Sequence, residues 1–423
     1  MNTPKIFSNE AFAVLKINNI RYFLSYRFLV TTATLMQSVI VGWQIYNLTQ
    51  DVLMLGIIGL VEVVPQVSIA LFAGHYADIW DRKKMIQYTT LLLVLGAAIL
   101  TTYSIPSLRC YEKFGVFPMF ITIFISGFVR GVMMPAQTAF LGQLVPRELL
   151  PNAATWSSTN WQLAAVIGPA LGGLIYGFWG IVPAYCLVFS LFAISIVFIS
   201  KVKSEQPTHT ISSDENIFGR IKEGVNYVFN NQILLGAFTL DMFAVLFGDA
   251  VALLPVFASD ILKTGPEGLG MLRACPAVGA IIMSAYLAFH PPVNKSGHKL
   301  LYCVAAFGIC MIGFALSKNF YLSAFLLFLS GSFDNLSVVV RGTILQVYTP
   351  EEVKGRVAAV NSIFIGSSNE LGSFESGATA KLMGIVNSVI FGGVMTLLVV
   401  GVAAKKAPLL RKLSIKDAIK EQA

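Results

Sequence analysis

The chain has 423 residues, of which 56% are hydrophobic and only 12% are charged, and its net charge is +8. Soluble domains carry about 25% charged residues, so this composition excludes an ordinary soluble enzyme. The hydrophobic residues, about 237 of them, would fill about twelve helices of the roughly 20 residues that a bilayer requires. The basic residues are scattered between hydrophobic runs, which argues against a nucleic-acid partner.

Hydrophobic runs bounded by charges, proline or glycine predict the membrane spans in chain order. In the first half the runs cover about residues 22–48, 53–77, 85–105, 116–141, 153–177 and 181–200. After a polar interval, six more cover about residues 232–258, 267–290, 299–317, 320–347, 357–380 and 384–404. We therefore expect an all-α integral membrane fold with twelve transmembrane helices in two six-helix halves and a substrate site between the halves.

The polar parts of the sequence complete the predicted organisation. The halves, residues 1–200 and 232–404, are joined by a cytoplasmic linker at 201–231 that contains a short amphipathic helix on the membrane surface. A basic cytoplasmic tail at 405–423 either lies against anionic lipid or is solvated. With the N-terminus inside, the cytoplasmic segments hold 21 of the 30 Lys and Arg residues and the opposite loops hold five. The positive-inside rule therefore places both termini in the cytoplasm.

The segment after the second span reads GHYADIWDRKK from Gly74 to Lys84. It resembles the signature of the major facilitator superfamily, G-x-x-x-D-R-x-G-R-[RK], in pattern and in position. Two residues depart from that signature, Ile79 in place of Arg and Asp81 in place of Gly. The resemblance implies a latch at the cytoplasmic gate, formed by Gly74, Asp78, Asp81, Arg82 and Lys83. A positive-inside anchor without a gating role is the alternative.

The fifth predicted span contains the run GPALGG at residues 168–173. It resembles the G-P-x-x-G-G element of the superfamily's antiporters, in which small residues allow close packing and a bend. The resemblance implies export, with Gly168, Pro169, Gly172 and Gly173 as the bend. A generic packing kink is the alternative.

Several further segments resemble the branch of the superfamily that holds enterobactin exporters and macrolide-efflux proteins. They include WQIYNLT at 43–49, GPEGLG at 265–270, TPEEVKGRV at 349–357 and NELGSFESG at 369–377, and the likeness covers about residues 20–400. It implies a monomeric secondary exporter in the bacterial cytoplasmic membrane that moves a small organic molecule by alternating access. The expected cargo is a siderophore, exported in exchange for protons, and the alternative is a macrolide or a range of drugs.

Ionisable side chains inside spans cost about 2.5–3.5 kcal/mol each on insertion scales, so each is a functional candidate. The expected proton-coupling residues are Glu62, Asp249, Glu370 and Asp334. Four arginines, Arg27, Arg130, Arg273 and Arg341, also fall within predicted spans. We expect ion pairs of Glu62 with Arg130, and of Glu370 or Asp334 with Arg341. These acids can exchange a proton, bind a cargo, or form structural pairs that fix helix register.

Aromatic and amide side chains on the spans suit the cavity of a planar or aromatic cargo. The candidates are Gln37, Trp43, Gln44, Asn160, Trp161, Phe243, Phe247 and Asn335. For each of them, packing between helices is the alternative role.

No pattern in the sequence indicates an enzyme, a cofactor or a bound metal. There is no Walker loop, and neither the four histidines nor the five cysteines have the spacing of metal ligands. Function classes left open beside export are a lipid flippase, a metal-ion exporter and a non-transporting receptor, because a fold does not determine a function.

Overall fold

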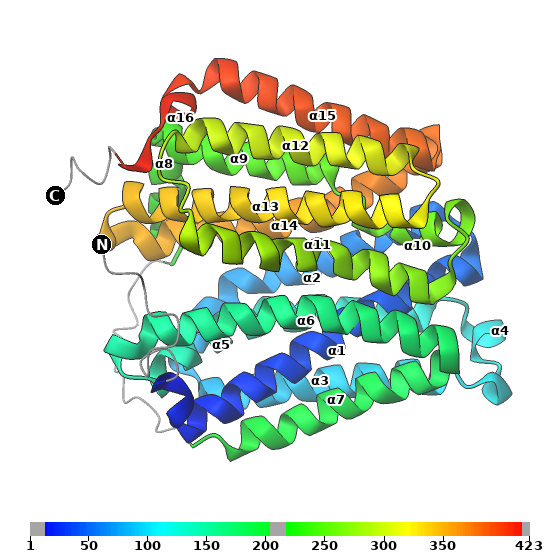
Figure 1. Cartoon of the computed structure of the whole chain (residues 1–423). Coiled ribbons are helices and arrows are strands. Elements are labelled where there is room, and N and C mark those ends of the chain that lie inside the picture. The colour runs from blue at the N-terminus through cyan, green and yellow to red at the C-terminus, as the bar shows by residue number, and fades with distance from the viewer. Residues whose placement is uncertain (1–12, 204–216, 417–423) are drawn as a thin grey trace. The chain divides into compact units, whose positions relative to one another are not determined.

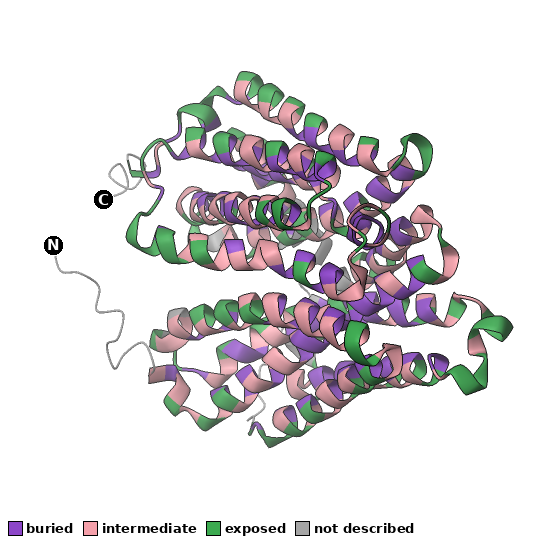
Figure 2. Cartoon of the chain, turned by 45° about the vertical axis from the view of Figure 1, so that its right-hand side comes forward, coloured by how far each residue is buried: buried purple, intermediate pink, exposed green. Residues whose placement is uncertain are grey.

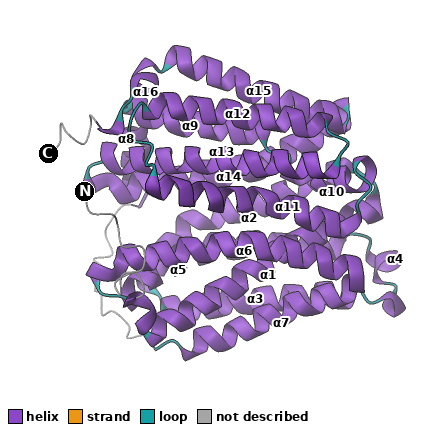
Figure 3. Cartoon of the chain, viewed as in Figure 1, coloured by secondary structure: helices purple, strands orange, loops and turns teal. Residues whose placement is uncertain are grey.

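The computed structural model describes residues 13–203 and 217–416, and within these ranges every regular element is a helix (Figure 3). Eleven of the described helices are long and hydrophobic enough to span a membrane. A twelfth, α14 (Glu351–Met383), is long enough but carries more polar and charged residues. These helices coincide with the twelve predicted spans, so the all-α transmembrane fold is confirmed.

The helices follow one another in chain order as Figure 1 shows. The first half contains α1 (Asn18–Thr49), α2 (Val52–Ile79), α3 (Arg82–Tyr103), the short α4 (Cys110–Phe114), α5 (Phe117–Leu144), α6 (Leu150–Trp179) and α7 (Ile181–Lys201). After α8 (Ile217–Asn230), the second half contains α9 (Gln232–Gly248), α10 (Leu254–Val256), α11 (Gly265–Phe289), α12 (Ser296–Leu316), α13 (Phe320–Tyr348), α14, α15 (Ile385–Lys406) and α16 (Pro408–Lys412). The predicted amphipathic helix is therefore α8. The last seven residues of the predicted tail lie outside the described ranges.

Helix boundaries follow from local sequence. Asn231 and Asn319 each accept hydrogen bonds from two backbone N–H groups in the first turn of the helix that follows, α9 and α13 respectively. Gly180 joins α6 to α7 with φ +86°, and Gly384 joins α14 to α15 with φ +88°. Glycine reaches such positive φ values without steric cost. Both glycines stand between the fifth and sixth long helices of their halves, so the two halves turn this corner in the same way.

The described helices pack into two compact units. The first unit contains residues 13–41 and 64–203, and the second contains Gly42–Val63 and residues 217–416. We call Gly42–Val63 the hairpin tip, because it consists of the end of α1, the turn and the start of α2. The tip thus groups with the second unit, although its sequence belongs to the first half.

Each long helix has a buried face and an exposed face (Figure 2). The exposed faces carry large hydrophobic side chains, among them Tyr321, Leu382, Tyr302 and Phe178, which are all more than 70% exposed. A soluble protein rarely presents so many hydrophobic side chains to water. A hydrophobic surface of this kind is what lipid contact requires.

Candidate functional site

Three acidic side chains of the second unit lie near Arg273 of α11. The carboxylates of Asp249, Glu62 and Glu370 all lie close enough for their charges to act on its guanidinium. They come from three different elements: the end of α9, the hairpin tip and α14. We call these four residues the Arg273 cluster. It unites three of the four acids that the sequence predicts for proton coupling.

Asp249 enters this cluster because α9 ends in the middle of its span. The backbone leaves the helix at Asp249, whose side chain accepts a hydrogen bond of 3.0 Å from the Val251 N–H group. The Ser376 hydroxyl of α14 donates to the Asp249 carbonyl oxygen at 3.0 Å. Both bonds satisfy polar backbone groups that the broken helix exposes, as a hydrocarbon environment demands. The break in the helix therefore places a carboxylate and the end of α9 at the same point in the span.

Glycines bring the hairpin tip against α14. A Cβ atom on Gly56 would lie 3.0 Å from the Gly377 Cα atom, and one on Gly59 would lie 2.5 Å from the Glu370 carbonyl oxygen. Only glycine allows two backbones to approach this closely. Glu62 stands one turn after Gly59 on α2, so this contact brings Glu62 to the level of Glu370.

Two polar contacts hold the tip at its turn. The Tyr46 hydroxyl donates a hydrogen bond of 2.5 Å to the Asp260 carboxylate in the π-helical turn η5 (Phe257–Ile261). The Lys381 ammonium of α14 lies 2.9 Å from the Asp51 carboxylate in the α1–α2 turn. Both contacts lie at the α1–α2 end of the helices, beyond the Arg273 cluster.

A second charged group lies between α9 and α13. Arg341 forms a buried salt bridge with Asp241, and each of the two side chains is less than 10% exposed. Asp334, two turns before Arg341 on α13, lies within electrostatic range of both. Arg341 therefore forms its salt bridge with Asp241, while Asp334 acts on it from a greater distance. We call Asp241, Asp334 and Arg341 the acid–arginine triad.

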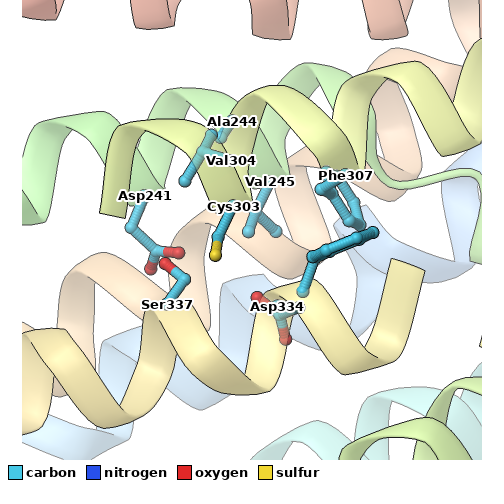
Figure 4. A pocket seen from close by; sticks show the side chains of 9 residues that line it. Asp241, Ala244, Val245, Cys303, Val304, Phe307, Asp334 and Ser337 are labelled. Atoms are coloured by element: carbon cyan, nitrogen blue, oxygen red, sulfur yellow. The ribbon is translucent and has the colours of Figure 1, made fainter. Parts of the chain in front are cut away.

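The triad borders a small cleft among α9, α12 and α13. Its lining includes the side chains of Asp241, Cys303, Asp334 and Ser337, which Figure 4 shows directed toward the cleft. The cleft has about 10 Å³ of space for a water-sized sphere. One buried water molecule needs about 10–15 Å³ by this measure. The cleft thus suits water or a small ion better than an organic cargo.

The predicted cavity residues of the second unit are in part brought together. Phe243 and Phe247 stack with ring centroids 6.4 Å apart, and Phe247 meets Phe391 of α15 edge-on at the same distance. The Asn335 amide oxygen accepts a hydrogen bond of 3.0 Å from Ser284 of α11. In the hairpin tip, Gln44 is buried and Trp43 is half-buried.

The predicted cavity residues of the first unit have separate surroundings. Asn160 of α6 donates a hydrogen bond of 2.7 Å to the Leu24 carbonyl oxygen of α1, so it ties two helices together. The Gln37 side chain is buried, and its Oε1 atom has no hydrogen-bond partner in the described part of the chain. Trp161 is 56% exposed. Gln37 is thus the one of these three with an unused polar atom.

The predicted gate motif spans the corner from α2 to α3. Asp81 is the N-cap of α3 and accepts hydrogen bonds from the backbone N–H groups of Lys83, at 2.9 Å, and Lys84, at 3.3 Å. Arg82 donates to the Ala139 carbonyl oxygen of α5, and Lys83 donates to the Ser200 carbonyl oxygen of α7. Asp81 therefore has a defined role as a helix cap, and the two cations link α3 to its neighbours. Gly74 and Asp78 lie in the last turns of α2, and the burial and contacts of both residues are outside the described part of the structure.

The glycines of the predicted bend motif lie where α6 packs on α1. A Cβ atom on Gly168 would lie 2.8 Å from the Thr32 carbonyl oxygen, and one on Gly172 would lie 3.1 Å from the Met36 carbonyl oxygen. Pro169 stands inside α6, which continues through Gly173 to Trp179 without a break. The small residues thus permit backbone contact between α6 and α1.

Arg130 of α5 belongs to the first unit and is exposed there. Its expected pair with Glu62, which belongs to the second unit, stays a prediction. Among the described residues, no group of three or more His, Cys, Asp or Glu side chains has the arrangement of a metal site.

A family model described as "Transmembrane secretion effector" matches residues 9–422 of the chain. The chain belongs to this family of major facilitator transporters. It is 22% identical over 401 residues to macrolide efflux protein A of Streptococcus pyogenes, covering 92% of this chain and 95% of that protein. It is 23% identical over 387 residues to the staphyloferrin A transporter of Staphylococcus aureus, covering 89% and 93%.

A solved structure of a D-xylose-proton symporter has the same fold, with a TM-score of 0.73 at 12% identity, covering 95% of this chain and 99% of that one. Family membership makes the chain a multi-pass membrane transporter of the efflux type that moves a small molecule, and not an enzyme.

Two residues of the site carry no predicted role in the sequence. Arg273 is visible there as an arginine within a span, but its three acidic neighbours come from distant segments. Asp241 lies within a span too, and the burial of Arg341 against it depends on how α9 and α13 are rotated. The sequence does show many charged residues inside spans, and each of them needs an ionic partner or a proton. Their number indicates that Arg273 and Asp241 have partners, but it does not identify these partners.

Proposed function

We propose that this transporter exports a small organic molecule in exchange for protons and that its cargo is a siderophore. The observation that carries the exchange is the Arg273 cluster, in which the charges of three carboxylates act on one guanidinium. The coupling residues we propose are Glu62, Asp249 and Glu370, with Asp334 as the link to the acid–arginine triad.

The acidic side chains of the cluster support proton exchange. They lie inside a membrane span, where an ionised group is costly, and a carboxylate that binds a proton loses its charge. A cationic or hydrogen-bonding cargo that reaches the same carboxylates removes the same charge. Competition between proton and cargo for one set of acids is the simplest basis of antiport.

The cargo assignment rests on similarity and on cavity chemistry. One relative over most of the chain is named a staphyloferrin A transporter, and staphyloferrin is a siderophore. Macrolide or multidrug efflux is the second candidate, because macrolide efflux protein A matches a similar share of the chain at similar identity. The stacked Phe243 and Phe247 rings form an apolar surface that suits the aromatic rings of a catecholate siderophore or the apolar ring of a macrolide.

We place the protein in the bacterial cytoplasmic membrane with both termini in the cytoplasm. The basic residues at the ends of the helices support this orientation. In the first unit, Lys201 ends α7 next to the corner at Arg82 and Lys83, because Lys83 donates to the Ser200 carbonyl oxygen. In the second unit, Lys405 and Lys406 end α15. The positive-inside rule assigns each of these ends to the cytoplasm. Lys381 and the hairpin tip then face the outside.

The experiment that tests the proposal is transport by the purified protein in proteoliposomes, with and without a pH gradient. The panel contains a catecholate siderophore, a carboxylate siderophore, a macrolide and a cationic dye. Gradient-driven movement of a siderophore alone is the expected result. Movement of the macrolide and the dye would instead establish multidrug efflux.

Variants separate coupling from binding in the same assay. Glu62→Gln and Glu370→Gln are expected to abolish the response to the pH gradient. The matched control is Glu112→Gln, an exposed acid in α4 whose side chain is 66% exposed. Undiminished gradient-driven transport by both cluster variants would remove these two acids as coupling residues.

A further inference from the structure

The cleft among α9, α12 and α13 lies apart from the Arg273 cluster and has its own set of polar groups. Asp241 comes from α9, Cys303 from α12, and Asp334 and Ser337 from α13. Asp334, Ser337 and Arg341 follow each other at intervals of three and four residues, so they occupy one face of α13. That face is turned toward Asp241, because Arg341 forms its salt bridge there.

The three charges of this cleft do not balance. Arg341 neutralises Asp241, with which it forms the salt bridge. Asp334 adds a second carboxylate whose charge acts on both partners. A buried set of two carboxylates and one guanidinium carries one surplus negative charge. Two carboxyl groups in such a set cannot both be ionised cheaply, so they take up one proton between them.

Unused hydrogen-bonding atoms point to a small ligand in the same place. The Ser337 side chain is only 2% exposed, lines the cleft, and its hydroxyl has no hydrogen-bond partner within the described ranges. The Nε atom of Arg341 is likewise buried without a partner there. A buried hydroxyl beside carboxylates supplies a donor or acceptor for a protonated carboxyl group or for a water molecule that carries the proton.

The neighbouring helices contribute few other charges at this level. At the start of α12, Lys299 acts on the Cys303 thiol that lines the cleft. On α15, which packs against α9 and α12, the charged residues are Lys405 and Lys406 in the last turn. The Thr396 hydroxyl of α15 donates to the Ala244 carbonyl oxygen at 3.2 Å.

From the Arg273 cluster, the charge of Asp249 acts on the triad. Arg273 lies on α11, which packs on α13, and Glu370 lies on α14, which packs on α9. Asp249, at the end of α9, is within electrostatic range of Asp334. Asp334 is thus the carboxylate through which the triad and the cluster act on each other.

We propose that the cleft is a proton-binding site in its own right, in which Asp241 and Asp334 share one proton and one guanidinium, that of Arg341. In the arrangement described, the proton is on Asp334, because Arg341 pairs with Asp241. The Ser337 hydroxyl stabilises the protonated carboxyl group, directly or through one water molecule. A contribution of this proton to transport rests on the proposed function, whereas its presence in the protein does not.

Infrared difference spectroscopy tests the site, because it distinguishes a protonated carboxyl group from a carboxylate. The substrate-free, full-length protein in lipid nanodiscs is titrated with acid and base, and protonated carboxyl groups are counted relative to the native chain. If Asp241 and Asp334 share one proton, Asp334→Asn should have one protonated carboxyl group fewer than the native chain. Asp241→Asn should also have one group fewer, because Arg341 is then left to neutralise Asp334. Arg341→Gln is expected to gain one group.

Controls keep the result independent of folding defects. Asp241→Asn with Arg341→Gln removes both partners of the salt bridge, so it leaves no unpaired charge from that pair, and it is expected to retain the native number of groups. Glu112→Gln is expected to match the native chain. Ser337→Ala is expected to retain the group with a shifted carboxyl band. Size-exclusion chromatography establishes that each variant is folded.

Three results would overturn the proposal. Retention of the group in Asp334→Asn would place the proton elsewhere. Retention in Asp241→Asn, with loss in Asp334→Asn, would mean that Asp334 binds it alone. Loss of the band when Na⁺ is added at constant pH would make Na⁺ the ligand. Because no cargo is present, failure of the export proposal leaves each of these results unchanged.

Discussion

Replacement of Gly59 by alanine tests whether backbone contact between the hairpin tip and α14 controls the state of the transporter. The added Cβ atom would lie 2.5 Å from the Glu370 carbonyl oxygen and 2.8 Å from the Ser373 Cβ atom. Neither neighbour is the far end of a flexible side chain, so α2 must move away from α14. Overpacking of this kind costs about 1–3 kcal/mol.

We call the hairpin tip docked when its backbone contacts α14 at Gly59, and undocked when this contact is broken. The steric cost of the added Cβ atom falls on the docked state alone. The gain in helix propensity from glycine to alanine, about 1 kcal/mol, is present in the docked and undocked tip and cancels between them. A difference of about 1–3 kcal/mol changes the ratio of the two states about 5- to 150-fold. Gly59→Ala is therefore expected to shift the population strongly toward the undocked tip.

The assay is cross-linking across the turn of the tip. Cysteines replace Asp51 and Lys381, whose charged atoms lie 2.9 Å apart, in a chain whose five native cysteines are replaced by serine. A short bifunctional maleimide should join them more slowly in Gly59→Ala than in the parent. The control is Gly401→Ala in α15, where an added Cβ atom meets open space. An unchanged rate in folded Gly59→Ala protein would refute the argument.

Three further predictions concern the charged groups and the helix cap. Arg273→Gln removes a guanidinium on which three carboxylates act, so it should lower thermal stability markedly, since breaking a buried ion pair costs about 3–5 kcal/mol. Added Glu370→Gln should restore part of that stability, and equal stability of the single and double variants would contradict this. Hydrogen bonds from Lys381 and from the Leu53 backbone N–H group lower the pKa of Asp51. The contact therefore stabilises the protein fully above the unfolded-state pKa of about 3.9, and this stabilisation is lost as the pH falls through the lower folded-state pKa. The difference in stability between native and Asp51→Asn protein should therefore vanish on acidification. A difference that grows on acidification would contradict a lowered pKa of Asp51. Asp81→Ala should cost about 1 kcal/mol by loss of the α3 cap while Asp81→Asn retains most of it, and equal melting temperatures of the two would remove the cap from the account.

The fold could be predicted from the sequence because hydrophobic length alone determines where a span begins and ends. All twelve spans were visible, including α14, whose polar residues hide it from a strict hydropathy criterion. The N-cap role of Asp81 was visible in principle too, because an aspartate directly before a helix is a common start signal. The gating role that the signature implies for Asp81 stays a prediction beside its role as a cap.

The partners of the charged residues could not be predicted in the same way. Residue counts give the depth of a side chain in a span, but not the side of the helix on which it lies. Spanning helices also lack the clear two-sided pattern that fixes rotation in soluble proteins. Depth alone led to the expectation of Glu62 beside Arg130, a pair that stays a prediction, but depth gave no indication that the charge of Glu62 also acts on Arg273. The Gly56 and Gly59 contacts that bring it there depend on tertiary packing.

Simultaneous measurement of cargo and proton movement tests the central claim most directly. Proteoliposomes loaded with a siderophore and a pH-sensitive dye report both movements in a single experiment. We expect outward movement of the siderophore to be accompanied by inward movement of protons. The double variant that combines Glu62→Gln and Glu370→Gln should lose the proton signal. Siderophore movement with no proton movement in the native protein would contradict it.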